Sequence, residues 1–144
     1  MFPEKGIFGI SRRNIDYKGR IFMPKFTEAE EKDQLVICVE NPEYLTLYNV
    51  ETLTKRVQEL RKGILASKNQ EKIDKLEAEL EKLYKSCITK TRIDSQGRLS
   101  IPVELVSKMK FSDEVVVMGT NDSVRISNPD NNESDEFGSL TKKM

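Results

Sequence analysis

A ten-residue motif that occurs twice places the strongest constraint on the fold of this chain. Residues 93–102 read Ile-Asp-Ser-Gln-Gly-Arg-Leu-Ser-Ile-Pro, and residues 15–24, 78 positions earlier, read Ile-Asp-Tyr-Lys-Gly-Arg-Ile-Phe-Met-Pro. The copies share five identities without a gap. A single Asp-x-x-Gly-Arg stretch indicates only a tight turn, but two copies at a fixed spacing predict a duplicated structural unit.

The repeat continues beyond the motif. The apolar runs 36–39 and 45–47 have counterparts 79 residues later, at 115–118 and 124–126. The offset grows by one, so the first copy lacks one residue between Pro24 and Val36. Two similar blocks, at about 14–49 and 92–128, therefore make up most of the chain.

Each block predicts a similar series of short elements. The motif Asp suits the first position of a four-residue turn and the Gly suits its last. The T-x-x-E spacing from Thr27 predicts a brief helix near 27–33, and Pro102 suits the first turn of the matching helix in the second block. Alternating or apolar runs predict strands at 7–15, 20–23, 35–39, 44–48, 87–93, 98–101, 114–119 and 123–127.

The segment 50–87 separates the blocks and has a helical period. Its first apolar series predicts a helix that weakens around Gly63, and the sequence from Ser67 to Gln70 has capping-box spacing and predicts the start of a second helix. The second series repeats at 3-4 spacing, which favours either a hairpin packed within the chain or contact with a neighbouring subunit. The two series are Leu53, Val57, Leu60 and Ile64, then Ile73, Leu76, Leu80, Leu83 and Cys87.

These elements predict an α+β fold. One block is too small to close a core, and duplication supplies a second half. We therefore expect two tandem β-hairpin repeats that form an intramolecular pseudo-dimeric barrel, with both motif turns on one face and an inserted helical hairpin. The expected divisions are 1–49, 50–86, 87–128 and an acidic, disordered tail at 129–144.

Composition excludes several classes of site. The chain has no histidine and two cysteines, so a zinc site or an imidazole-based catalytic triad is excluded and no cofactor is expected. Cys38 and Cys87 are expected to be buried free thiols, which fits a reducing cytoplasm. The sequence shows neither a secretory signal nor an apolar run long enough to span a membrane, which also favours a cytoplasmic location.

Charge is unevenly distributed although the net charge is zero. Residues 1–27 carry a net +4, residues 85–110 carry another +4, and the remainder carries −8. Each basic stretch contains one copy of the motif. This asymmetry predicts a polyanionic partner at the two motifs.

The motif arginines have two interpretations. In the structural one, Asp16 and Asp94 clasp Arg20 and Arg98 only to hold the turns. In the functional one, the Asp orients a guanidinium that binds phosphate or the O6/N7 edge of guanine. Gly19 and Gly97 complete the turns in both, and the candidates for further phosphate contacts are Arg12, Arg13, Lys18, Lys90 and Arg92.

The doubled Asp-x-x-Gly-Arg, followed by apolar-x-apolar-Pro, resembles the MraZ family of bacterial transcriptional regulators, within the AbrB-like swapped-hairpin superfamily. The opening Met1-Phe2 and the strand 115–119 match as well, and the resemblance covers roughly residues 1–128. It implies two AbrB-like repeats and a ring-forming, nucleoid-associated cytoplasmic protein. It also implies binding to promoter repeats of the division and cell-wall gene cluster, usually with repression. Arg20 and Arg98 take the place of the DNA-binding arginines, and Arg13 matches a superfamily DNA contact that is Thr91 in the second copy.

Three classes of function compete. The first is a sequence-specific DNA-binding repressor that contacts double-stranded promoter DNA. The second is an antitoxin-like or adaptor module that uses the same fold to bind protein without DNA. The third is an enzyme, and the sequence opposes it because it shows neither a plausible nucleophile–base pair nor a glycine-rich phosphate loop.

Overall fold

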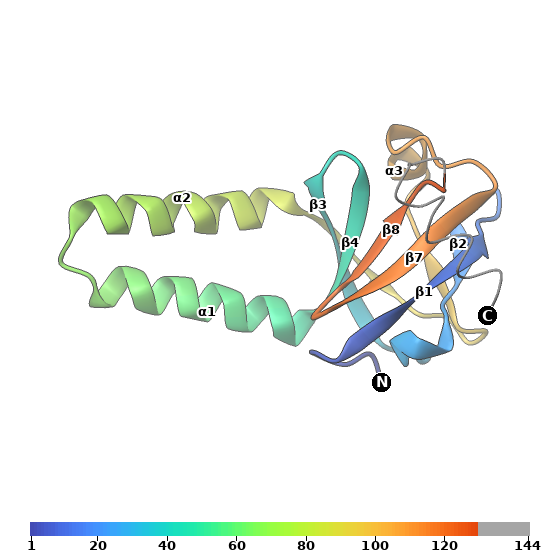
Figure 1. Cartoon of the computed structure of the whole chain (residues 1–144), viewed down its shortest axis with the longest axis horizontal. Helices are drawn as coiled ribbons and strands as arrows, with labels where there is room; N and C mark the ends of the chain where they lie inside the picture. Colours follow the sequence, from blue (N-terminus) through green and yellow to red (C-terminus); the bar gives the residue numbers. More distant parts are fainter. Residues whose placement is uncertain (130–144) are drawn as a thin grey trace.

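The structure, a computed structural model, describes residues 1–129. The predicted acidic tail lies outside the described residues except for Pro129. The chain has an α+β fold with a largely antiparallel sheet and three α-helices among the described residues. A two-helix hairpin extends from one side of the body that contains the strands (Figure 1).

The strands form a six-stranded sheet and a two-stranded one. The larger has the order β1-β7-β8-β4-β3-β5 and the smaller pairs β2 with β6, with all pairs antiparallel. The bounds in chain order are β1 Ile7–Asn14, β2 Arg20–Phe22, β3 Gln34–Asn41, β4 Tyr44–Asn49, β5 Cys87–Arg92, β6 Arg98–Ser100, β7 Glu114–Asn121 and β8 Val124–Ser127.

Pairing between the strands crosses the two halves of the chain. The first strand of one half pairs with the third strand of the other, as β1 with β7 and β5 with β3. The second strands pair with each other, and so do the fourth, β4 with β8. Single bridges, Ile15 to Ile21 and Ile93 to Leu99, link the outer strands β1 and β5 to the small sheet. Neither half therefore completes its sheet without the other.

The main core joins the two sheets, and β3 and β4 are buried on both faces because Val36, Cys38 and Tyr48 pack against the base of the helical hairpin. Ile21 and Leu99 are fully buried under the small sheet, and Ile7, Leu35, Ile37, Leu45, Leu47, Val115, Val117, Val124 and Ile126 are fully buried in the large one. Phe2 joins this core, with its N–H donated to the Asp33 carboxylate at 2.8 Å and its carbonyl accepting from Asn49 Nδ2 at 2.7 Å. The core thus fixes the position of the small sheet that carries the motifs.

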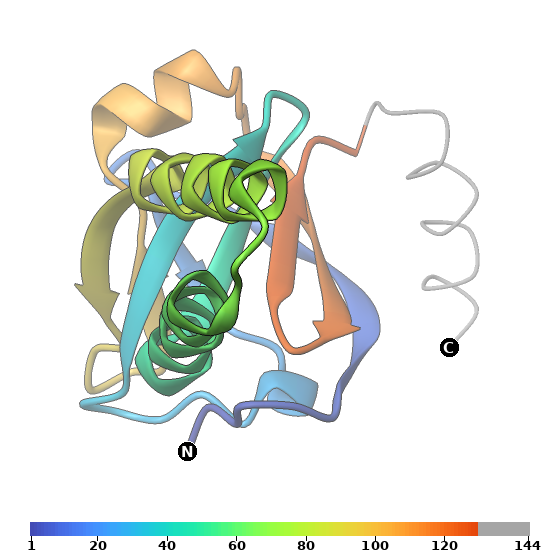
Figure 2. The same ribbon diagram turned by 90° about the vertical axis from the view of Figure 1, so that its left-hand side faces the viewer.

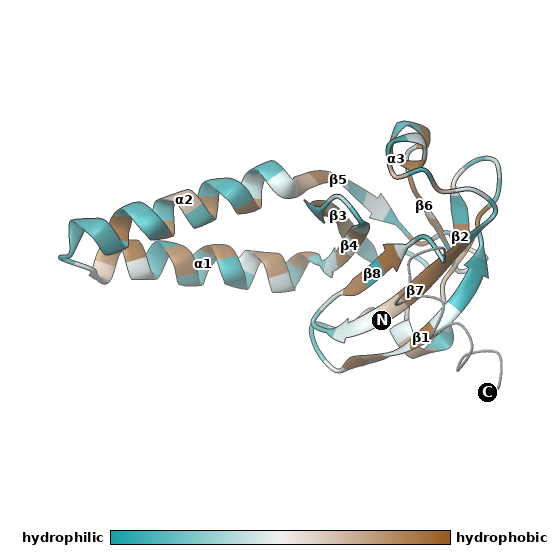
Figure 3. Cartoon of the chain, turned by 45° about the horizontal axis from the view of Figure 1, so that its top comes forward, coloured by the Kyte–Doolittle hydropathy of each residue, from teal (hydrophilic) through white to brown (hydrophobic). Residues whose placement is uncertain are grey.

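The helical hairpin joins α1 (Val50–Ala66) to α2 (Gln70–Ser86), and Figure 2 views it end-on. Its residues are largely hydrophilic, with hydrophobic residues interspersed along both helices (Figure 3). The half-buried apolar residues of the two helices lie along the contact between them, and Leu53 and Leu83 at the base are buried. The 3-4 seam of the second helix is thus used within the chain.

Two expectations about this hairpin were wrong in detail. The N-cap of α2 is Asn69, whose side chain accepts from the Lys72 N–H at 3.2 Å, while Ser67 Oγ accepts from the Asn69 N–H. The first helix also continues through Gly63. A Cβ on Gly63 would lie 3.0 Å from Leu76 Cδ1, so the missing side chain lets the two helices approach closely.

The predicted helix at 27–33 was wrong. The chain forms only a 3₁₀ turn, Lys25–Thr27, because Glu28 and Lys32 adopt left-handed φ values of 53° and 75°. The Thr27 hydroxyl donates back to the Pro24 carbonyl at 2.7 Å, so it closes a turn rather than capping a helix. The second half does contain the expected helix, α3 (Val103–Lys108), which follows Pro102.

Candidate nucleic-acid interface

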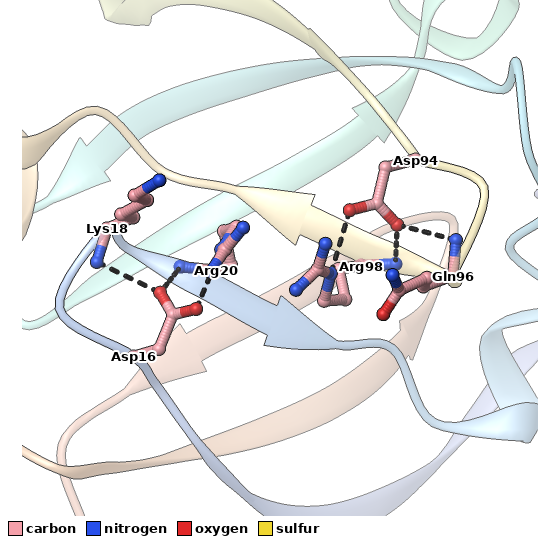
Figure 4. Close-up of polar contacts among 6 residues, drawn as sticks. All are labelled: Asp16, Lys18, Arg20, Asp94, Gln96 and Arg98. Atoms are coloured by element: carbon pink, nitrogen blue, oxygen red, sulfur yellow. Dashed lines mark hydrogen bonds and ion pairs between the residues drawn. The ribbon is translucent and has the colours of Figure 1, made fainter.

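The first motif turn is held by one carboxylate. Asp16 Oδ1 accepts the backbone N–H groups of Lys18 at 3.0 Å and Arg20 at 2.9 Å, and Oδ2 accepts Arg20 Nε at 2.7 Å. Backbone bonds from Gly19 N to Asp16 O and from Asp16 N to Arg20 O close the turn. The carboxylate therefore fixes both the turn and the direction of the guanidinium (Figure 4).

The second turn repeats this geometry. Asp94 Oδ1 accepts the N–H groups of Gln96 and Arg98, both at 2.9 Å, and Oδ2 accepts Arg98 Nε at 2.8 Å. Gly97 has a φ of 79°, against 78° for Gly19. This left-handed conformation is costly for residues with a side chain, which explains the glycine in each turn.

The same contacts favour charged carboxylates. The pKa of Asp16 is lowered, mainly by the backbone N–H of Arg20 and also by its side chain. For Asp94, partial burial raises the pKa, but the N–H groups of Arg98 and Gln96 outweigh this and the net shift is downward. Both groups therefore remain acceptors for the arginines near neutral pH.

The ion pairs leave most of each guanidinium free. Within residues 1–129 only Nε of Arg20 and Arg98 bonds to protein, which leaves the Nη atoms of both as unused donors. The two side chains retain 27% and 19% of their exposure. A guanidinium fixed through Nε and open at its Nη atoms can form paired hydrogen bonds to a phosphate or a base edge.

The small sheet brings the two motifs together on one face. In the β2–β6 ladder, Arg20 lies opposite Ser100 and Phe22 lies opposite Arg98. Ile21 and Leu99 between them point inward and are fully buried, so the other residues of both strands face outward. The arginines lie between the two motif carboxylates on neighbouring strands (Figure 4).

The other basic residues predicted to contact phosphate differ in how exposed they are and in their partners within the protein. Lys18 is exposed at the first turn, with its ammonium 5.7 Å from the Tyr17 ring centroid, and Arg92 is exposed on β5. Arg12 is engaged instead, because its Nη1 donates to Glu114 Oε1 at 2.8 Å. Arg13 is half-buried, and its Nε is buried without a hydrogen-bond partner among the described residues. Lys18 and Arg92 are thus free to bind an anion, whereas Arg12 would first have to leave Glu114.

Sequence reasoning missed the aromatic side chains of this face. Phe22 is 52% exposed and lies beneath Arg98, and Tyr17 is 85% exposed at the tip of the first turn. The outward position of Phe22 could have been predicted from the sequence Arg20-Ile21-Phe22. With Ile21 in the core, strand alternation places its neighbours on the outer face.

The sequence of this chain is similar to those of known bacterial proteins. No family model matches the chain. It is 29% identical over 111 residues to a transcriptional regulator MraZ of Cutibacterium acnes, covering 77% of this chain and 73% of that protein. It is 27% identical to the MraZ of Finegoldia magna over 78% of this chain and 74% of the relative, and 29% identical to that of Ureaplasma urealyticum over 82% and 78%. The predicted resemblance to the MraZ family is confirmed.

The MraZ relatives are named as transcriptional regulators and not by any reaction. Within the described residues there is no group of three or more His, Cys, Asp or Glu side chains placed to hold a metal ion. Over the same residues no helix is long and apolar enough to cross a membrane. The paired motif arginines are therefore the strongest candidates for the functional residues of this MraZ-like chain.

Proposed function

We propose that the chain is a sequence-specific DNA-binding transcriptional regulator, and that the outer face of β2 and β6 contacts promoter DNA. The observation that carries the proposal is the pair of motif arginines, each anchored through Nε to an Asp and each with free Nη donors. The naming of the relatives as transcriptional regulators supports it.

Arg20 and Arg98 take the role of base readers or central phosphate contacts. Preorganised guanidinium groups suit this role, because bidentate binding to guanine discriminates against other bases by about 1–3 kcal/mol. Lys18 and Arg92 bind flanking phosphates, joined by Arg13 and, after release from Glu114, by Arg12. Asp16, Gly19, Asp94 and Gly97 shape the turns and do not themselves bind DNA.

The fold suits such a surface if the two halves act as AbrB-like repeats of a pseudo-dimeric barrel. The crossed pairing of β1 with β7 and β5 with β3, together with the two bridges to the small sheet, supports this view. Under it, the two motifs are pseudo-symmetric halves of one DNA-contacting face, with the helical hairpin inserted between the repeats.

We further propose that the chain assembles into a homo-oligomeric ring. Phe8 on β1 is 67% exposed and Ile88 on β5 is 49% exposed, and these strands are the opposite ends of the six-stranded sheet. A contact between two different edges is heterologous, and such contacts generate rings when the rotation closes. The helical seam that first suggested oligomers is used inside the chain, so the sheet edges now carry this proposal.

The biological setting follows the family resemblance. We propose a cytoplasmic, nucleoid-associated repressor that acts on promoter repeats of the division and cell-wall gene cluster. Repeated operator sites suit a ring, because several subunits then bind one DNA molecule and gain affinity through effective concentration.

A salt-titrated binding experiment tests the proposal. The full chain is mixed with the DNA upstream of its own gene and, as a matched control, with a shuffled fragment of the same length and base composition. We expect tighter binding to the first fragment, with an affinity that falls steeply with salt as phosphate contacts release counterions. Equal affinity for both fragments would remove sequence specificity, and no binding at low salt would favour a protein-interaction module.

A further inference from the structure

Two cysteines that are far apart in sequence lie side by side in the fold. Cys38 is in β3, and Cys87 is the C-cap of α2 and the first residue of β5. The two are paired in the β3–β5 register, and their Sγ atoms are 3.6 Å apart. Both are free thiols. The prediction of buried free thiols is correct for Cys38 but wrong for Cys87, which is half-buried at the end of the hairpin. The two thiols lie next to each other in space, which neither the repeat nor the proposed DNA contact requires.

The two sulfurs lie close together at an irregular point of the sheet. Cys38 pairs with Cys87 where the β3–β5 register shifts, directly after the pair Ile37 and Thr89, and a disulfide needs the sulfurs at about 2.0 Å rather than 3.6 Å. The Cys38 thiol is directed at Cys87 Sγ, and the Cys87 thiol lies 3.3 Å from the Leu83 carbonyl oxygen. Joining them requires the sulfurs to move closer by about 1.5 Å.

Access to the two thiols is unequal. Cys38 is fully buried, and burial, reinforced by Cys87, raises its pKa. Cys87 is half-buried and lines a groove of about 570 Å³ between the base of the hairpin and β5. The groove also contains Tyr84 and Ile88 with two cations, Arg61 and Lys90. In the single chain, the groove therefore gives a small anionic molecule a path to Cys87 but not to Cys38.

We propose that Cys87 and Cys38 form a reversible dithiol–disulfide site that reacts with small disulfides carrying carboxylate groups. The Cys87 thiolate attacks one sulfur of the small disulfide, forms a mixed disulfide and releases one small thiolate. The Cys38 sulfur then attacks Cys87 Sγ, and its proton passes to the second small thiolate as that thiolate leaves. The protein loses two electrons and two protons, and the small disulfide becomes two thiols.

The bond would fasten the hairpin to the sheet. Cys38 belongs to the cluster that joins the two, with Val36, Tyr48, Leu53 and Leu83. A link between residues 38 and 87 closes a long loop in the unfolded chain, and long loops give the larger stabilisation. Oxidation should therefore raise the melting temperature of the folded chain, by roughly 5 °C or more, and reduction should reverse the rise.

Oxidised glutathione is the probe for the test, applied to the full chain and followed by intact mass. We expect the wild type to lose two hydrogen atoms, to stay monomeric on a denaturing gel and to recover its mass with dithiothreitol. Cys38→Ser should stop as a glutathione adduct on Cys87, because the resolving thiol is absent. Cys87→Ser should remain unmodified while folded, because Cys38 is buried.

Several outcomes would overturn the proposal. These are two free thiols in the wild type after incubation, a wild-type adduct that never resolves, a disulfide between chains, or modification of Cys38 in folded Cys87→Ser. A melting temperature that is unchanged or lower after oxidation would show that the bond does not fit the native geometry. Circular dichroism of each variant before oxidation confirms that the reaction is measured on folded protein.

Discussion

Arg98 lies over the aromatic ring of Phe22, with its Cζ 5.7 Å from the ring centroid, whereas Arg20 faces Ser100 across the same ladder. The two motifs have nearly identical turns, but their neighbours across the strands differ. The face on which the arginines lie is therefore not symmetric, and the two arginines are expected to respond differently to changes around them.

Phe22→Leu tests this difference. The substitution keeps an apolar side chain but removes the ring, and an exposed cation–π contact contributes about 0.5–1 kcal/mol. If Arg98 binds DNA from this position, we expect a small loss of affinity for the proposed promoter fragment in a binding titration. Phe22→Tyr keeps the ring and should bind like the wild type. Equal binding by all three proteins would show that the ring does not position Arg98 for DNA.

The turn glycines provide a matched pair for stability. A Cβ on Gly19 would clash with the Ile101 carbonyl oxygen, whereas one on Gly97 would meet nothing within 4 Å. Both residues have φ near +80°, so Gly97→Ala should cost only the backbone term, about 1–2 kcal/mol. Gly19→Ala should cost clearly more, because the β2–β6 contact must move. Urea denaturation measures the stability of both variants. Equal losses of stability would contradict the expectation that Gly19 is the more crowded of the two positions.

The motif carboxylates predict a loss of stability in acid. The pKa values of Asp16 and Asp94 are lowered from 3.8, so folding favours the charged forms. This stabilisation is complete above about pH 4 and is lost as pH falls through the folded pKa values. We expect the free energy of unfolding to fall below that pH, and to fall less in an Asp16→Asn, Asp94→Asn double variant. If the free energy of unfolding changed with pH in the same way in the wild type and the double Asn variant, the lowered pKa values of Asp16 and Asp94 would be contradicted.

The packing of the hairpin base against the sheet should depend strongly on Leu83. Its side chain is 6% exposed and packs in the cluster between α2 and the sheet. Removing a buried leucine costs about 2–5 kcal/mol, so Leu83→Ala should lower the denaturation midpoint strongly. Leu65→Ala, at a position that is 87% exposed near the end of α1, is the control and should change stability little. A mild effect at Leu83 would mean that the hairpin contributes little to folding.

Local features of the sequence predicted much of the structure. The motif turns followed from Asp and Gly, because their geometry is set within five residues, and the Asp–Arg contacts span only four positions. The helix predicted at 27–33 did not form, for the opposite reason, because this segment also bonds to Phe2, which is distant in the sequence. Thr27 has the spacing of a capping box, but its hydroxyl bonds backward and Asp33 binds the N–H groups of Phe2 and Glu30. Tertiary contacts thus override the local preference.

Long-range partners could not be predicted from local patterns. Arg12 is a candidate phosphate contact, and its ion pair with Glu114, which is 102 residues away in the sequence, was not foreseen. The pairing of Cys38 with Cys87 was equally hidden, because it depends on how β5 returns to β3 after the hairpin. Which strands pair is decided by the packing of the whole core. Hydrophobic periodicity or a local motif therefore predicts that a strand exists but not which strand lies beside it.

The central claim is that Arg20 and Arg98 contact DNA and do not merely clasp their turns. The direct measurement is promoter affinity, as a function of salt, for the Arg20→Ala, Arg98→Ala double variant and for a charge-matched Lys72→Ala, Lys75→Ala control on exposed positions of α2. Asp16→Ala and Asp94→Ala keep the arginines and should show a milder defect. We expect the double Arg variant to fold with only a small loss of stability, because exposed ion pairs contribute little. Our account also predicts weak binding and a smaller salt slope for this variant, with normal binding by the lysine control. A folded double Arg variant that binds the promoter as tightly as the wild type would contradict the claim.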